Sequence, residues 1–157
     1  MNTVKAKFRI YIDTSIVGGY FDKEFETETK ALFKRLENKE VIFVVSDVLE
    51  YEVKKGKPHL QELLAKYDKN YLEYVELTEE AKALANCYIA EKIVGVKHLD
   101  DCQHIAIATI NKVDILASWN FKHIVNFDKI KMYNGVNLQH GYTAIEIRNP
   151  KDLINNI

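Results

Sequence analysis

The fold of this chain is decided by one stretch near its start, Phe8–Ser15, with the sequence FRIYIDTS. The apolar, β-branched and aromatic residues of its first half are typical of a buried strand. The strand ends in Asp13, and the two hydroxyl residues that follow are good N-caps for a helix. Ligands of open parallel sheets bind outside the carboxyl ends of the strands, where the chain order reverses. Asp13 lies where such a site is expected, although taken alone it is explained more simply as a helix cap or a turn residue.

The composition of the 157 residues, 47% hydrophobic and 29% charged, is that of one soluble globular domain spanning 1–157. No apolar run approaches the ~20 residues that cross a bilayer, and residues 1–7 lack the apolar core of a signal peptide. We therefore expect a cytoplasmic protein that does not bind membranes. Cys87 and Cys102 lack metal-type spacing and are interpreted as small buried hydrophobes. The net charge of −1 argues against nucleic-acid binding driven by global charge, but not against a local basic patch.

Apolar runs alternate with segments of helical periodicity along most of the chain. Strands are expected at 8–12, 41–45, 72–77, 114–118 and 143–148, the last an edge strand closed by Pro150. Helices are expected at about 24–37, 48–55 and 58–67, from 78, from 100, and at 127–133, with a short helix or turn at 16–20. This alternation indicates an α/β domain of three layers, α/β/α, around a mostly parallel central sheet.

Acidic residues recur where strands end or helices begin. Asp13 ends the first strand, Glu50 or Glu52 lies in the helix after the second, and Asp101 opens a later helix. Carboxylates brought together repel one another unless protons or a cation neutralise them. Mg²⁺ or Mn²⁺ is the simplest neutraliser, because both prefer oxygen ligands and keep several waters. Such an ion can activate water for attack on a phosphodiester. The alternative is that these acids are helix caps and solvated side chains, as is expected for Asp100.

Four segments together resemble the PIN-domain ribonucleases, and most of all the VapC-like toxins of type II toxin–antitoxin pairs. They are YIDTS at 11–15, VSDVLEYE at 45–52, DCQHIAIA at 101–108 and LASWNFKH at 116–123. The resemblance covers nearly all of residues 8–125, and the C-terminal extension, 126–157, carries less of it. It implies a PIN-like fold and a metal-dependent endoribonuclease acting on RNA.

The resemblance also implies roles for particular residues. The acid about six residues after the strand-ending serine, Ser46, is Glu52, with Glu50 as the fallback. Asp13, Glu52 and Asp101 would hold the ion, with Asp100 as a second fallback acid. Thr14, Ser15, Ser46 and Ser118 would support them.

One position departs from the family pattern. Where many members have a fourth acid, this chain has Asn120. Its amide can still orient a metal-bound water, and we count it among the catalytic residues. Losing one negative charge is expected to weaken ion binding.

Basic side chains near these segments are candidate contacts for RNA phosphates. They are Lys54, Lys55 and Lys57 beyond Glu52, and His123 after the fourth segment. Cations at a helix end have an equally good explanation in the helix dipole. His104 falls one turn after Asp101, but a helix histidine is more often a packed side chain, and we leave it outside the site.

We therefore expect a Mg²⁺- or Mn²⁺-dependent endoribonuclease, with an antitoxin protein and a homodimer implied by analogy alone. Two alternatives remain. One is a catalytically weak or inactive PIN-like module that binds RNA or a protein partner, as Asn120 suggests. The other, an aspartyl-phosphate phosphatase, is disfavoured because Ser15 stands where that chemistry usually has a second acid.

Overall fold

The computed structural model describes residues 7–157. The expectation that residues 1–7 are not a signal peptide therefore falls almost entirely outside the described residues. The elements are, in chain order, β1 (Phe8–Ile12), α1 (Thr14–Gly19), α2 (Glu26–Glu37), β2 (Val41–Ser46), α3 (Asp47–Lys54), α4 (Pro58–Ala65), η1 (Lys69–Tyr71), β3 (Leu72–Val75), α5 (Glu79–Ala90), η2 (Val96–His98), α6 (Leu99–Ile110), β4 (Ile115–Ala117), α7 (Phe127–Gln139), β5 (Ile147–Arg148) and α8 (Pro150–Ile154). Within this range, no helix has both the length and the apolar character needed to span a membrane.

The five strands form one sheet in the order β3-β2-β1-β4-β5, and every pair is parallel. The chain runs outward from β1 to β3 and then returns to place β4 on the other side of β1. The chain order therefore reverses between β1 and β4, and the carboxyl ends of these two strands lie side by side there. Asp13 and Ser118 directly follow these two strand ends.

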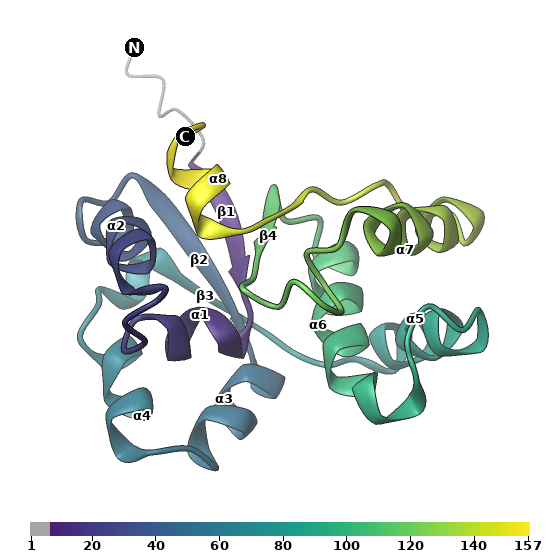
Figure 1. Cartoon of the computed structure of the whole chain (residues 1–157), viewed down its shortest axis with the longest axis horizontal. Helices are drawn as coiled ribbons and strands as arrows, with labels where there is room; N and C mark the ends of the chain where they lie inside the picture. Colours follow the sequence, from purple (N-terminus) through teal and green to yellow (C-terminus); the bar gives the residue numbers. More distant parts are fainter. Residues whose placement is uncertain (1–6) are drawn as a thin grey trace.

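Helices cover both faces of the sheet, which confirms the three-layer prediction. Figure 1 shows α1, α2 and α4 on one side of the strands and α5, α6 and α7 on the other. The strands alternate between the two faces: Ile10 and Ile12 pack in one buried cluster, whereas Tyr11 packs in the other. Side chains of a strand point alternately to opposite faces, so continuous apolar runs are what a sheet covered on both sides requires.

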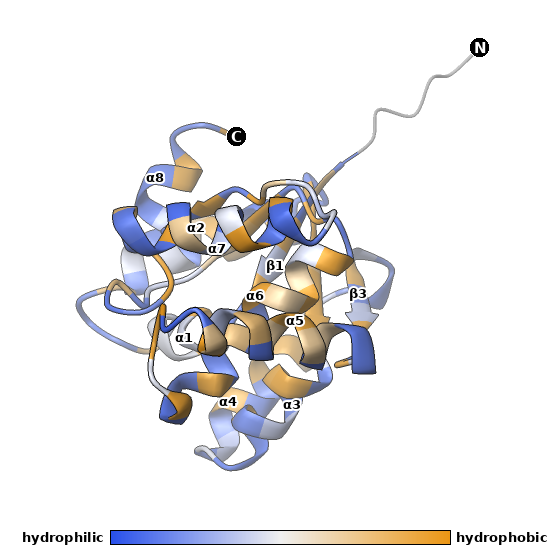
Figure 2. Ribbon diagram, turned by 90° about the vertical axis from the view of Figure 1, so that its right-hand side faces the viewer, coloured by the Kyte–Doolittle hydropathy of each residue, from blue (hydrophilic) through white to orange (hydrophobic). Residues whose placement is uncertain are grey.

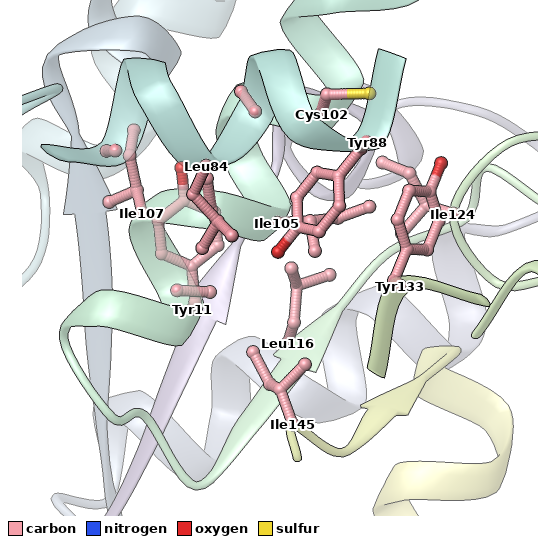
Figure 3. Packing of buried hydrophobic residues seen from close by; sticks show 14 of the residues in the cluster. Tyr11, Leu84, Tyr88, Cys102, Ile105, Ile107, Leu116, Ile124, Tyr133 and Ile145 are labelled. Carbon is pink, nitrogen blue, oxygen red and sulfur yellow. The ribbon is translucent and has the colours of Figure 1, made fainter. Parts of the chain in front are cut away.

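The helix α6 lies deepest in the second layer. From Cys102 to Thr109 only Gln103 is not fully buried, and its small residues Ala106 and Ala108 allow close packing, as the sequence predicts. Figure 2 shows α6 and α5 lying close together, with many apolar positions on both. Around α6, Tyr88 of α5 meets Tyr133 of α7 edge to face, with ring centroids 5.0 Å apart (Figure 3).

The C-terminal part departs from the sequence-based prediction. The edge strand expected at 143–148 is only Ile147–Arg148, and Pro150 opens the helix α8 instead of ending the structured chain. The cause is local, because Asn149 accepts the Asp152 N–H at 3.0 Å as an N-cap and proline needs no N–H at the first helical position. α7 is also longer than the predicted 127–133, since its buried face continues through Val136 and Asn137.

Candidate active site

Asp13 is held at the carboxyl end of β1 and is only 3% exposed. Its Oδ1 accepts the Ser15 hydroxyl at 2.5 Å and the Ile16 N–H at 3.3 Å. Its Oδ2 accepts the Ser118 hydroxyl at 2.5 Å. Burial raises the pKa of Asp13 above its usual value, although the charge of His104 and these hydrogen bonds oppose the rise. Asp13 is thus both the N-cap of α1 and a fixed carboxylate at the point of chain reversal.

A chain of hydrogen bonds joins the end of β1 to the end of β4. The Trp119 N–H donates to Ser15 Oγ at 2.8 Å, and the Asn120 N–H donates to Ser118 Oγ at 3.0 Å. The side-chain oxygen of Asn120 then accepts the His123 N–H at 3.0 Å. The structure therefore brings the hydroxyls of Ser15 and Ser118 together around Asp13. The Asn120 side-chain oxygen also stabilises the loop that follows β4, through its hydrogen bond from the His123 N–H.

Glu52 comes from α3 and points at α6, where its Oε1 lies 2.6 Å from His104 Nε2. A carboxylate accepts only, so the Nε2–H donates this bond. The other ring nitrogen, Nδ1, lies 2.6 Å from the Tyr11 hydroxyl, which lies 2.7 Å from Ser46 Oγ. His104 is 2% exposed and joins α3, α6, β1 and the end of β2 in one polar network. Sequence reasoning left His104 outside the site.

A signal for His104 was present in the sequence. It stands three residues after Asp101, and residues at that spacing share one face of a helix. The hydrogen-bond partners of His104 could not be inferred from the sequence, because Tyr11 and Glu52 lie 93 and 52 residues away. Ser46 was predicted as a supporting residue, and it lies in this network while also capping α3 through the Leu49 N–H at 3.1 Å.

The ionisation states of Glu52 and His104 are coupled. Burial alone would raise the pKa of Glu52, but the hydrogen bond and charge of His104 lower it overall. Burial alone would lower the pKa of His104, yet its bond to Glu52 and the charges of Asp13, Glu52 and Asp101 raise it. Each partner therefore favours the charged form of the other.

Asp101 lies in the first turn of α6 and is half-buried. Burial raises its pKa, the charges of Asp13 and Glu52 raise it further, and His104 and His98 oppose them. The three carboxylates thus lie near enough to act on one another through their charges, around His104. The fallback acids Glu50 and Asp100 are both exposed to solvent.

Solved structures share this architecture, although no protein-family model matches the chain and a search of curated proteins gives no match. VapBC2 from Rickettsia felis, solved with a promoter DNA fragment, superposes with a TM-score of 0.57 at 16% identity, over 90% of this chain and 98% of that one. FitAcB from Neisseria gonorrhoeae gives 0.57 at 12% identity, over 90% and 98%. The sarcin–ricin-loop-cleaving toxin VapC20 from Mycobacterium tuberculosis gives 0.56 at 10% identity, over 87% and 98%. This chain has the PIN-domain fold.

The acids of the site are candidate ligands for a divalent ion. In the part of the chain that the structure describes, no group of three or more His, Cys, Asp or Glu side chains is arranged to hold a metal ion. Mg²⁺ often needs only one or two carboxylates, because it keeps several waters. Asp13 and Asp101 supply this donor set, and burial is the largest cause of the raised pKa of each carboxyl group. In the described part of the chain the buried Thr14 hydroxyl has no well-formed hydrogen bond, and it acts on the pKa of Glu52. The residues fit a hydrated ion.

The predicted RNA contacts lie in different places on the PIN domain. Lys54 lines a hollow between α3 and α4 together with Glu50, and Lys55 places its ammonium 4.2 Å from the centre of the Tyr51 ring. Lys57 is exposed before α4. His123 lies beside the site instead, with its ring centroid 3.7 Å from that of His98. His98 in turn places Nδ1 3.7 Å from Asp101 Oδ2.

Proposed function

We propose that this chain is a Mg²⁺- or Mn²⁺-dependent endoribonuclease that acts in the cytoplasm as the toxin of a toxin–antitoxin pair. The observation that supports the proposal is that Glu52 is hydrogen-bonded to His104, while Asp13 and Asp101 lie near enough for their charges to act on the same imidazole. The fold is shared with VapC20, which cleaves the sarcin–ricin loop. Fold alone does not establish function, so the acids carry more weight than the likeness.

Asp13 and Asp101 would hold the ion, with Glu52 as the third acid directly or through water. The bound ion would supply an activated water and stabilise the charge that develops on the phosphate. The hydroxyls of Ser15 and Ser118 fix both oxygens of Asp13 in one orientation. His104 holds Glu52 through Oε1 and keeps it ionised. Positioning of this kind is how protein groups around ligands tune a metal site.

Asn120 would act through its amide nitrogen. Its oxygen is bonded to the His123 N–H, so the NH₂ group is the part left to donate to a water or a phosphate oxygen. A neutral donor here removes one negative charge from the neighbourhood of the substrate. We expect weaker ion binding and less repulsion of RNA than a fourth acid would give.

RNA cleavage by the purified chain tests this proposal. With Mn²⁺ present, Asp13→Asn and Asp101→Asn should each lower the cleavage rate at least about a hundredfold while far-UV circular dichroism stays unchanged. Asp100→Asn tests which of the adjacent acids Asp100 and Asp101 is needed for cleavage, and it should keep most of the activity. Asp128→Asn, an exposed acid of α7, is the matched control. Full activity of Asp101→Asn would refute the assignment.

A non-catalytic PIN-like module is the second candidate, favoured by one observation. Within residues 7–157 no three acidic or histidine side chains form a ready metal site, and Glu52 is already bonded to His104. Calorimetric titration with Mn²⁺ separates the candidates. Absence of binding at millimolar Mn²⁺ would favour a module that binds RNA or a protein partner.

An antitoxin partner and a homodimer belong to the same proposal. Structural neighbours include a toxin–antitoxin complex from Klebsiella pneumoniae and VapBC from Salmonella typhimurium bound to DNA. Sedimentation equilibrium of the purified chain tests the homodimer: a mass near twice 18.2 kDa is expected. A mass of one chain at micromolar concentration would contradict it.

A further inference from the structure

A hollow of about 590 Å³ opens beside the acidic site, between the end of α5, η2 and the loop that follows β4. Among the residues that the structure describes, every charged or ionisable side chain in its lining is basic. We call it the lysine groove, lined by Lys92, Lys97, His98, Lys122, His123 and Lys129. These residues come from three separate parts of the chain, which the fold brings to one place.

Within residues 7–157, no carboxylate compensates the positive charge of the groove lysines. Among residues 7–157, none of the four lysines has a carboxylate oxygen within 4.0 Å, although other surface lysines form such pairs. The Lys129 ammonium donates to the Lys122 carbonyl at 3.0 Å, which holds two parts of the lining together. In a chain of net charge −1, four unpaired cations around one hollow concentrate the positive potential there.

The lysine groove adjoins the acidic site through His98 and His123. His98 places Nδ1 3.7 Å from Asp101 Oδ2, and its ring lies against that of His123, with centroids 3.7 Å apart. The His123 N–H is bonded to Asn120, the residue two positions after Ser118. A chain of direct contacts therefore leads from the carboxylates to the lysines.

The ring of His123 lies within the positive field of the groove lysines. Its Nδ1 is buried and has no hydrogen-bond partner in the part of the chain that the structure describes. Its pKa is lowered, first by burial and then by the charges of His98, Lys129, Lys122 and Lys97. Bound phosphate would supply the counter-charge that these groups lack.

We propose that the lysine groove binds the phosphodiester backbone of single-stranded RNA next to the bond that is cut. The inference rests on the proposed function, because it assigns the path of that substrate away from the acids. The lysines contact successive phosphates, which positions the strand without reading its sequence. The His98–His123 pair lies between the two parts and separates the phosphate being cut from those being held.

Binding in the absence of divalent ions tests the groove separately from catalysis. A fluorescent single-stranded RNA of twelve nucleotides is titrated with the full chain in EDTA, and a gel confirms that the RNA stays intact. The variant Lys97→Glu/Lys122→Glu should raise Kd at least about tenfold. Each phosphate contact on a single strand contributes ~0.7 to the salt slope, so the slope of log K against log salt should shrink by about 1.4.

The matched control is Lys66→Glu/Lys151→Glu, which makes the same charge change at two exposed lysines away from the groove. Its Kd should change less than about threefold, and both variants should keep the far-UV spectrum of the parent. Equal loss of affinity in both pairs, or unchanged affinity in the groove pair, would overturn the proposal. Loss of binding to poly-glutamate without loss of RNA binding would assign the groove to an acidic protein and overturn it too.

The outcome separates this inference from the proposed function. A chain that never cleaves RNA with Mn²⁺, yet loses RNA affinity in the groove variant, keeps the groove and refutes the nuclease. A chain that cleaves RNA normally, with the groove variant binding as tightly as the parent, keeps the nuclease and refutes the groove.

Discussion

The imidazole of His104 ties the folded state to pH. Its pKa is raised above 6.5 because the bond to Glu52 and three acidic charges outweigh burial. The folded protein therefore binds this proton more tightly than the unfolded chain does. The resulting stabilisation is complete below pH 6.5 and is lost as the pH rises through the raised value.

We expect the stability advantage of the parent over His104→Gln to shrink as the pH rises from 6 to above the folded pKa. At pH 6, removing one partner of this buried network should cost about 1–3 kcal/mol. Urea unfolding of both proteins in EDTA at a series of pH values measures the difference. An advantage that grows with pH would show that His104 is neutral in the folded protein at pH 6.

The two cysteines should differ in reactivity. Burial, with the nearby charge of Asp101, raises the pKa of Cys102 to about 12, and the side chain is fully buried. Cys87 is partly exposed on α5. Because the thiolate is the reactive form, a disulfide reagent at pH 8 should label one thiol per folded chain and two after unfolding. Cys87→Ser should remove the fast reaction, and rapid labelling of that variant would contradict the burial of Cys102.

The candidate acids can be picked out of the sequence more easily than the residues they contact. Asp13 and Asp101 carry a local signature, an acid at a strand end or a helix start, which is visible in a few neighbouring letters. His104 contacts Tyr11 and Glu52, and this meeting of β1, α3 and α6 exists only in the folded chain. The same holds for the contact of His98 with His123.

At the scale of elements, the short helix α1 depends on one glycine. A Cβ at Gly19 would lie 2.8 Å from the Trp119 ring and 3.0 Å from Thr29 Oγ1, whereas a Cβ at Gly18 meets nothing within 4 Å. The Trp119 ring cannot easily give way, because its N–H donates to Thr29 Oγ1 at 2.8 Å and its face stacks on Phe25. α1 must therefore shift to accommodate any side chain at Gly19.

Gly19→Ala should lower the free energy of unfolding by about 1–3 kcal/mol, the usual range for overpacking. Gly18→Ala is the matched control and should leave it unchanged or raise it by up to about 1 kcal/mol, because alanine is the better helix former. Thermal unfolding followed by circular dichroism measures both. Similar stability of the two variants would mean that α1 does not pack against Trp119 as described.

The strands and most helices were predictable because their signals are local. β2 is a largely apolar run, and α5 is capped by Thr78, whose hydroxyl accepts the Ala81 N–H at 3.1 Å. The last segment was not predictable in the same way. Ile147 pairs with Leu116 as part of a two-residue strand, so its place depends on β4 and not on a pattern of its own. From the sequence, Pro150 could equally end a strand or begin a helix. It begins the helix α8, because Asn149 caps the helix N-terminus.

At the scale of the whole molecule, one sheet serves two buried clusters. Ile10 and Leu116 lie on neighbouring strands but face opposite layers, Ile10 with α1 and α2, and Leu116 with α5, α6 and α7 (Figures 1 and 3). Both helical layers therefore pack against the same five-stranded sheet. The acids likewise come from both sides, with Asp13 at the start of α1 and Asp101 at the start of α6. The site therefore exists only while both layers stay on the sheet.

This sharing predicts a single cooperative unfolding transition, as expected of one domain. Leu116→Ala empties part of one cluster and should cost about 2–5 kcal/mol, which lowers Tm by roughly 6–15 °C for a chain of this size. Trp119, the single tryptophan, lies in the other cluster. Its fluorescence should nevertheless report the same lowered Tm as far-UV circular dichroism. Ile10→Ala, on the Trp119 side, is the companion variant and should also move both signals together. A Trp119 transition that keeps the parent midpoint in Leu116→Ala would mean that the two layers unfold separately, and the acids from α1 and α6 would then not share one rigid frame.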